Sequence, residues 1–208
     1  MKVLSTFFIM KQLFPFIHWD VPTVRKELFL TFDDGPMPGL TPWVLDTLRQ
    51  FNAKATFFCL GKNAEQNPEL IARIRTEGHS IGNHTFAHSN GWKSNTRDYL
   101  DDVERGASIL ETKLFRPPHG RLKPSQVIRL RKKYNIVMWN SQSNDYDTRV
   151  SPDECFDRVL RSARFGSIML FHDNIKAERN IRFVLPKVLE HYSLKGFRFE
   201  NLERLVTS

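Results

Sequence analysis

The stretch LFLTFDDGPMPGLTP, residues 28–42, joins a hydrophobic run to two adjacent carboxylates, Asp33 and Asp34, and a Gly-Pro pair. An apolar run of this length that ends at a turn signal is typical of a buried strand. Neighbouring carboxylates repel each other, but a cation between them removes the repulsion. One aspartate would then bind the cation, while the other remains a free base. A turn aspartate beside a helix-capping aspartate is the alternative explanation.

Strand-like runs alternate with helical patterns along the whole chain. Strands are predicted at 27–32, 54–60, 79–84, 135–139, 167–173 and 197–201, and helices at 41–51, 67–78, 94–113, 123–134, 151–163 and 181–192. Thr41 is expected to cap the first helix, with Pro42 at its first position. The alternation predicts an α/β fold with a mainly parallel sheet, in which chemistry gathers at the carboxyl ends of the strands.

Composition sets few limits on function. The 208 residues, 40% hydrophobic and 26% charged, fit one globular domain. A formal net charge of +8 would suit an acidic polymer, a nucleic acid or a membrane surface. The densest basic run, 121–133, has no accompanying nucleic-acid-binding motif, and a solvated helix face explains it. We therefore expect no nucleic-acid partner.

Residues 1–26 are expected to pack on the main domain, 27–208, or to associate weakly with a membrane. Their longest uncharged run, 3–10, is too short to span a bilayer, and no clear cleavage site for a signal peptide follows it. We expect a cytoplasmic protein, with peripheral membrane attachment or non-standard export as alternatives. Cys59 and Cys155 lie in apolar sequence and are expected to be buried thiols.

Three further polar motifs follow strand-like runs. HTFAH places His84 and His88 four residues apart, a spacing that suits zinc together with one carboxylate but also arises by chance on surfaces. In RPPHG, Arg116 can orient a carboxylate, and the two prolines leave the N–H of His119 for a ligand. LFHD presents His172, whose usual pKa of about 6.5 suits proton transfer. A core histidine is the alternative for His172.

In this order, TFDDGP, HTFAH, RPPHG and LFH resemble the motifs of polysaccharide deacetylases of the NodB-homology type, carbohydrate esterase family 4. The resemblance covers residues 27–200. It implies a distorted, incomplete (β/α) barrel. It also implies a metal-dependent hydrolase of carbon–nitrogen bonds that removes N-acetyl groups from a chitooligosaccharide or a peptidoglycan-like glycan and releases acetate.

The resemblance also implies a role for each aspartate. Asp33 would be the general base. Asp34, His84 and His88 would bind a divalent ion, with zinc favoured and cobalt, nickel or manganese as alternatives. This division agrees with the one metal-binding and one free carboxylate inferred from the residues alone.

The remaining roles follow from the third and fifth motifs. Arg116 would orient Asp33. The backbone N–H of His119 would help to hold the oxyanion. His172 would be the general acid, and Leu170 would line a pocket for the acetyl methyl group.

Two positions depart from the family's pattern. His119 stands where tyrosine is frequent, and function should be retained because the expected contact is from the backbone. Trp139 is followed by Asn140 where aspartate is frequent, while Asp145 fits a later acidic position of the same motif. A neutral Asn140 would leave His172 with a lower pKa than an aspartate there, so Asn140→Asp is expected to move the alkaline limb of the pH–rate profile upward. Asp145 is the alternative residue for tuning His172.

A glycan is the expected partner, and its rings are expected to meet aromatic side chains. Trp92, Trp139 and Tyr146 are the candidates for stacking, with Asn140 as a further substrate contact and core packing as the alternative for Trp139. Two other functions remain open: a glycan-binding homologue with little or no activity, and a metal-dependent amidase for a small non-sugar amide. The lack of long insertions favours an open groove and an oligosaccharide.

Overall fold

Strand β2 (Glu27–Asp33) is the centre of the fold. It pairs in parallel with β3 (Ala55–Cys59) on one side and with β8 (Ile168–His172) on the other, and its first residues pair with β9 (Arg198–Phe199). All seven residues of β2 and all five of β3 are buried. Burial on both faces explains why these strands are uninterrupted apolar runs. The structure is a computed structural model that describes residues 12 and 14–207.

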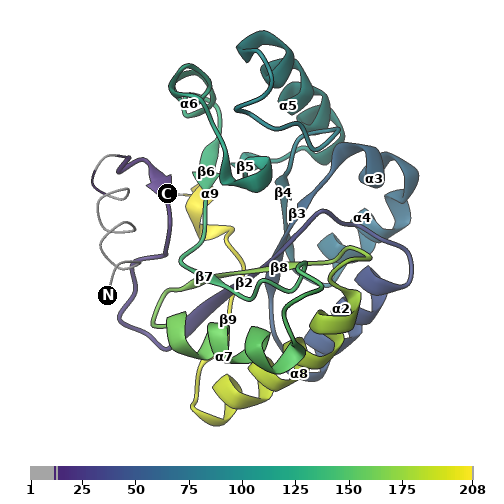
Figure 1. Ribbon diagram of the computed structural model, residues 1–208, viewed down its shortest axis with the longest axis vertical. Coiled ribbons are helices and arrows are strands. Elements are labelled where there is room, and N and C mark those ends of the chain that lie inside the picture. The colour runs from purple at the N-terminus through teal and green to yellow at the C-terminus, as the bar shows by residue number, and fades with distance from the viewer. Residues whose placement is uncertain (1–11, 13, 208) are drawn as a thin grey trace.

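The other strands extend the sheet on both sides of this centre. They are β1 (Ile17–His18), β4 (Ser80–Asn83), β5 (Leu114–Phe115), β6 (Asn135–Val137) and β7 (Ser141–Gln142). The order is β1-β6-β5-β4-β3-β2-β8-β7, and the paired strands run parallel. No pairing joins β1 to β7 among the described residues. The predicted α/β fold, an incomplete barrel, is therefore confirmed (Figure 1).

Helices lie around the outside of the sheet (Figure 1). They are α2 (Leu40–Gln50), α3 (Gly61–Gln66), α4 (Pro68–Thr76), α5 (Thr96–Leu110), α6 (Pro124–Leu130), α7 (Pro152–Ser162), α8 (Glu178–Leu194) and α9 (Arg204–Thr207), with a short 3₁₀ turn, η1 (Pro118–Gly120). Within the described part of the chain, no helix combines the length and apolar character needed to cross a bilayer.

Aromatic rings and both cysteines fill the core. Phe32 stacks on Phe57 and on Phe171, with ring centroids 5.0 and 5.9 Å apart. Cys59 and Cys155 are buried free thiols, as predicted. The three rings come from β2, β3 and β8, so the same packing that fills the core also holds the ends of these strands together.

Two local predictions are wrong. Helix α2 follows Gly39, so Thr41 is not its cap. Instead, the Thr41 hydroxyl donates a hydrogen bond of 2.5 Å to Oδ2 of Asp173 and accepts one from the N–H of Met37. Helix α3 follows β3 where no helix was predicted, because its six residues are too few to show a helical period.

The described part of the first 26 residues packs on the domain. Strand β1 pairs with β6, and Ile17 is 7% exposed. Phe14, Phe16 and Trp19 pack against the hydrophobic cluster that contains Ile17. Residues 1–11 and 13 lie outside the described residues, and so does the weak membrane association predicted for the start of the chain.

Helix α5 packs closely on the loop that follows β4, and this contact yields a stability prediction. A Cβ added at Gly106 would lie 2.6 Å from Oδ1 of Asn83 and 3.0 Å from the carbonyl carbon of Thr85. Gly106→Ala should therefore destabilise the protein by about 1–3 kcal/mol, although alanine is the better helix former. Urea unfolding measures the change.

Ser108→Ala is the matched control, because Ser108 is exposed on the same helix. It should change the free energy of unfolding by less than about 0.5 kcal/mol. A Gly106→Ala protein as stable as this control would mean that α5 and the loop do not pack as closely as described.

Candidate active site

The carboxyl ends of several strands open into one groove of about 470 Å³. The β2–β8 register places Asp33 beside His172, and His84 follows the last residue of β4. Nine of the residues singled out from the sequence line the groove: Asp33, Asp34, His84, His88, His119, Trp139, Tyr146, Leu170 and His172. The parallel sheet thus brings together side chains that are far apart in the sequence.

Asp33 is held by a buried arginine. Nη1 of Arg116 donates a hydrogen bond of 2.7 Å to Oδ1 of Asp33, and both residues are almost completely buried. The same nitrogen contacts the Thr31 hydroxyl, while Nη2 donates to the carbonyl of Met138. The guanidinium also lies 4.1 Å from the ring centre of Phe58. Because Arg116 is fixed on several sides, it holds Asp33 in one orientation.

Asp34, His84 and His88 form a candidate metal site, with ligand atoms within 4.8 Å of one another. Nε2 of His88 lies 3.1 Å from Oδ1 of Asp34, and Nε2 of His84 lies 3.6 Å from it. This Oδ1 is buried and accepts no hydrogen bond from the described residues. A buried carboxylate oxygen that faces two imidazoles fits a divalent cation, which would satisfy it.

Neighbouring groups orient the ligands of this site. Nδ1 of His84 donates to the carbonyl of Arg116 at 2.8 Å, so its Nε2 is left unprotonated toward the metal site. Nδ2 of Asn174 donates to Oδ2 of Asp34 at 2.7 Å, which leaves Oδ1 for a cation. Nδ2 of Asn63 donates to the Asp34 carbonyl at 2.8 Å. These contacts hold the ligands in place from behind.

The backbone around the metal site is strained. Asp34, Thr85 and His88 have φ values of 78°, 66° and 62°, a left-handed conformation that costs a non-glycine residue about 1–3 kcal/mol. Such strain persists where the surrounding structure fixes it, and it is concentrated at functional sites. Here it turns one carboxylate and one imidazole toward the same point.

Charges at the site favour the forms that bind a metal. Burial lowers the pKa of His84, and the charges of Asp33 and Asp34 oppose this only in part. Burial would raise the pKa of Asp34, but the neighbouring imidazoles, His88 first, lower it below its usual value. A neutral imidazole and an ionised carboxylate are the ligand forms that a metal needs.

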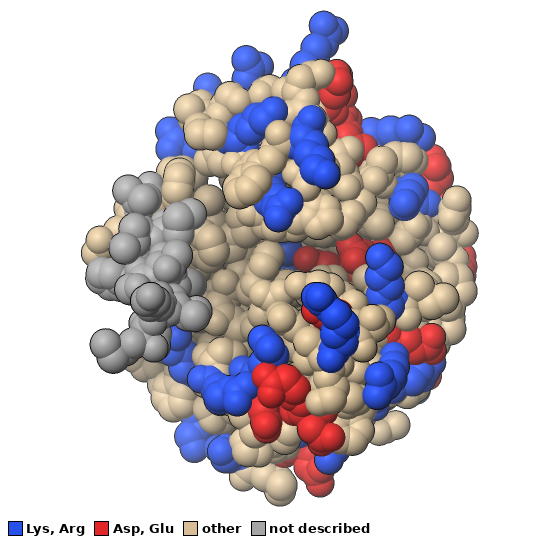
Figure 2. All heavy atoms as spheres, in the orientation of Figure 1, with Lys and Arg blue, Asp and Glu red and all other residues tan. Residues whose placement is uncertain are grey.

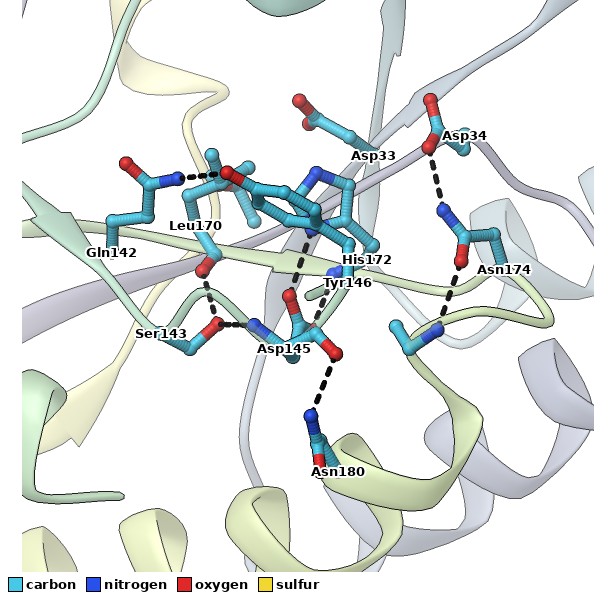
Figure 3. A network of polar contacts seen from close by, with 12 residues as sticks. Asp33, Asp34, Gln142, Ser143, Asp145, Tyr146, Leu170, His172, Asn174 and Asn180 are labelled. Atoms are coloured by element: carbon cyan, nitrogen blue, oxygen red, sulfur yellow. Dashed lines mark hydrogen bonds and ion pairs between the residues drawn. The ribbon is translucent and has the colours of Figure 1, made fainter. Parts of the chain in front are cut away.

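His172 and Asp145 form the second polar pair of the groove (Figure 3). Oδ1 of Asp145 lies 2.8 Å from Nδ1 of His172, and Oδ2 accepts the backbone N–H of His172 at 2.8 Å. Burial on its own lowers the pKa of His172, but the Asp145 charge and hydrogen bond outweigh it and raise the pKa to about 9. His172 is therefore a protonated acid at neutral pH.

Two other residues hold the backbone of Asp145 in place. The Ser143 hydroxyl lies 3.3 Å from the N–H of Asp145, and Nδ2 of Asn180 donates to the Asp145 carbonyl at 3.0 Å (Figure 3). Asp145 is completely buried, so it touches His172 rather than the groove. It is a positioning residue for His172.

His119 lies at the edge of the metal site. Its ring is exposed and meets the ring of His88 edge-on, with centroids 4.7 Å apart. Burial and the charges of His88 and Arg121 lower its pKa. Its φ of 59° puts a left-handed residue in the turn that follows Pro117 and Pro118.

Aromatic side chains form the wall beside His172. The ring of Tyr146 meets the imidazole edge-on at 4.9 Å, and Tyr146 is 40% exposed (Figure 3). Nε1 of Trp139 donates to Oε1 of Gln142, whose Nε2 donates in turn to the Tyr146 hydroxyl at 3.3 Å. Leu170 lines the groove below this wall.

Two predicted substrate contacts do not line the groove. Oδ1 of Asn140 accepts the N–H of Ile168 at 3.1 Å, so Asn140 lies at the start of β8, away from His172. This corrects the expectation that Asn140 contacts substrate or tunes the acid, because strand register carries its side chain to the other end of β8. Trp92, 60% exposed, stacks on Arg121 outside the metal site.

Several residues of the site were missed in the sequence. Asn174, Gln142 and Lys176 line the groove but belong to no motif of the sequence. Arg121 also lines the groove, although the basic run 121–133 to which it belongs was expected to be a solvated helix face. Asp173 lies beneath Gly35, where an added Cβ would come within 2.1 Å of Oδ2. In the sequence, only its place at the end of LFHD indicated that Asp173 lies near the site.

Comparisons with known proteins agree with this geometry. A family model described as polysaccharide deacetylase matches residues 20–139. A peptidoglycan-N-acetylglucosamine deacetylase of Bacillus cereus is 34% identical, over 94% of this chain and 96% of its own length. A chitooligosaccharide deacetylase of Azorhizobium caulinodans is 32% identical, over 72% of this chain and 74% of its own length.

A solved deacetylase structure is also similar to this chain. The crystal structure of a peptidoglycan N-acetylglucosamine deacetylase in complex with an N-oxidanyl-benzamide superposes with a TM-score of 0.85. The identity is 35%, and the match covers 90% of this chain and 91% of that one. The likeness therefore extends over most of both chains.

Proposed function

Because the chain belongs to the polysaccharide deacetylase family, we propose that it hydrolyses the N-acetyl groups of an N-acetylated glycan with the help of a bound divalent ion. The observation that carries the proposal is the arrangement of one groove. A candidate metal site lies there beside Asp33, which Arg116 orients, and beside His172, which Asp145 keeps protonated. Base, metal ligands and acid are thus present together.

Zinc is the ion that we propose for Asp34, His84 and His88. Two imidazoles and one carboxylate are a donor set that zinc accepts while coordination positions stay open, and the unpaired Oδ1 of Asp34 supports a cation at this place. When bound, such an ion polarises the acetyl carbonyl and lowers the pKa of a water molecule. Cobalt, nickel and manganese are the alternative ions, because a mixed set of imidazole and carboxylate donors can also hold them.

Asp33 acts as the general base. Its Oδ1 is occupied by Arg116, and its Oδ2, 3.8 Å from Nε2 of His84, faces the metal site. Asp33 removes a proton from the attacking water, whose oxygen forms the new bond to the acetyl carbon. The hydrogen bond from Arg116 holds the carboxylate in position for this step.

His172 acts as the general acid on the other side of the reacting bond. Its Nδ1 is held by Asp145, so Nε2 is the atom that gives its proton to the departing amine as the carbon–nitrogen bond breaks. The backbone N–H of His119 is the proposed donor to the oxyanion, a contact commonly worth about 3–4 kcal/mol. Leu170 offers an apolar surface to the acetyl methyl group. The products are acetate and a free amino sugar.

The two other functions have less support. A glycan-binding homologue would not need a buried arginine on Asp33 or a carboxylate that raises the pKa of His172 to about 9. An amidase for small amides would suit a closed pocket, whereas Tyr146, which lines the groove, is 40% exposed. Both observations favour a deacetylase for a polymer.

Metal removal tests the proposed function. Purified protein should contain a divalent ion and should release acetate from N-acetylated chitooligosaccharides and from peptidoglycan. Dialysis against a chelator should abolish this activity, and added zinc should restore it, because Asp34, His84 and His88 then regain their cation. Metal analysis and an acetate assay are the measurements. Protein without a metal, or acetate release that resists chelation, would overturn the proposal.

A further inference from the structure

We propose that Arg121 and Lys176 make the groove select N-acetylated glycans that carry carboxylate groups over neutral ones. This inference rests on the proposed deacetylase function and specifies its substrate. Both residues line the groove, and neither takes part in the chemistry derived above. They are also part of the net charge of +8, which the deacetylation chemistry itself does not require.

Arg121 lies against Trp92 beside the metal site. Its guanidinium carbon lies 5.0 Å from the centre of the Trp92 ring, and Nε1 of Trp92 donates to the carbonyl of Leu122 at 3.2 Å. The hydrogen bond holds one edge of the indole, and the guanidinium lies over the indole ring. Stacking uses none of the N–H groups at the edge of the guanidinium, so they remain available for a carboxylate.

Lys176 brings a second positive charge from another part of the sheet. It follows β8, whereas Arg121 follows β5, and strands β4, β3 and β2 lie between these two in the sheet. Lysine and arginine side chains lie above and below the central hollow of the surface, and acidic side chains lie within it (Figure 2). An extended glycan in the groove would thus pass a positive charge on each side of the reacting sugar.

The charges of the groove are otherwise matched. Asp33 is paired with Arg116, Asp145 is paired with His172, and Asp34 belongs to the metal site. Among the described residues, no carboxylate lies within ion-pair distance of Arg121 or Lys176. Two uncompensated positive charges on the substrate's path favour a negatively charged polymer.

The test compares two glycans that differ only in charge. One is a peptide-free oligosaccharide of alternating N-acetylglucosamine and N-acetylmuramic acid, and the other is the same oligosaccharide with its carboxylates converted to methyl esters. The holoenzyme should have the lower KM for the free acid, and the difference should shrink as salt is added. In Arg121→Gln/Lys176→Gln, the KM for the acid should rise about fivefold relative to the ester, as expected for partly exposed charge pairs.

Arg129→Gln/Lys132→Gln is the matched control. Both residues are exposed at helix α6 or just after it, outside the groove, and the change in net charge is the same. The control should keep the wild-type ratio of KM values. Equal KM values for acid and ester in the wild type, or an equal loss of discrimination in both double variants, would overturn the inference. Failure to release acetate from both of these glycans and from N-acetylated chitooligosaccharides would instead overturn the proposed function, whereas release from the chitooligosaccharides alone would overturn only this inference.

Discussion

Asp33→Asn is expected to lower deacetylation turnover by about 10²–10⁴-fold while the protein still binds its divalent ion. The amide keeps an oxygen for the 2.7 Å hydrogen bond from Arg116, but it cannot accept a proton from water. The ligand atoms of Asp34, His84 and His88 are unchanged, so metal content should remain at the wild-type level. Single-turnover acetate release and metal analysis of the same sample measure the two effects.

Asp34→Asn is the matched variant, because it makes the same chemical change at the next residue. Asp34 supplies the oxygen that faces both imidazoles, so this variant should lose metal as well as turnover. Its loss of activity should be partly reversed by excess zinc, whereas that of Asp33→Asn should not. Equal metal loss in the two variants would mean that their roles have been assigned wrongly. Thermal unfolding checks that the charge left on buried Arg116 has not unfolded Asp33→Asn.

Asp145→Asn is expected to shift the alkaline limb of the pH–rate profile downward. A general acid works only while it is protonated, so activity falls as pH rises through its pKa. With Asp145 the pKa of His172 is about 9. Without that charge, burial lowers the pKa of His172 and only the charges of Asp33 and Asp34 still oppose it, so the pKa should fall. A fall to the ordinary histidine value of about 6.5 would by itself reduce kcat/KM at pH 8 about thirtyfold.

Asn140→Asp is the control for this shift. The Asn140 side chain accepts a hydrogen bond from Ile168, about 13 Å along β8 from His172, so a carboxylate there should leave the alkaline limb in place. The measurement is kcat/KM on an N-acetylated oligosaccharide across the pH range. An unchanged limb in folded, metal-loaded Asp145→Asn would show that Asp145 does not govern the protonation of His172. A shift in Asn140→Asp would contradict the position of Asn140 in the fold.

The sequence by itself determined the fold class and the residues at the strand ends. The apolar run before Asp33 and the alternation of strands and helices predict a parallel sheet, because periodicity and turn residues are local properties. Parallel strands then place Asp33, His84 and His172 at one edge of the sheet without further information. The candidate metal site could be predicted because the type and spacing of Asp34, His84 and His88 already suit a divalent cation.

Only the tertiary structure showed the contacts that hold those residues in place. Arg116, which the family resemblance assigns to Asp33, reaches it across 83 positions, and Asp145 reaches His172 across 27. Asn174, which no motif indicates, reaches Asp34 across 140 positions. Asn140 was the first candidate in the sequence for tuning His172 and Asp145 was the alternative, and the structure decides for Asp145, because Asn140 contacts Ile168 while Asp145 contacts His172. Local patterns cannot encode such contacts, since their geometry is fixed only when distant strands pack and bury the polar groups against each other.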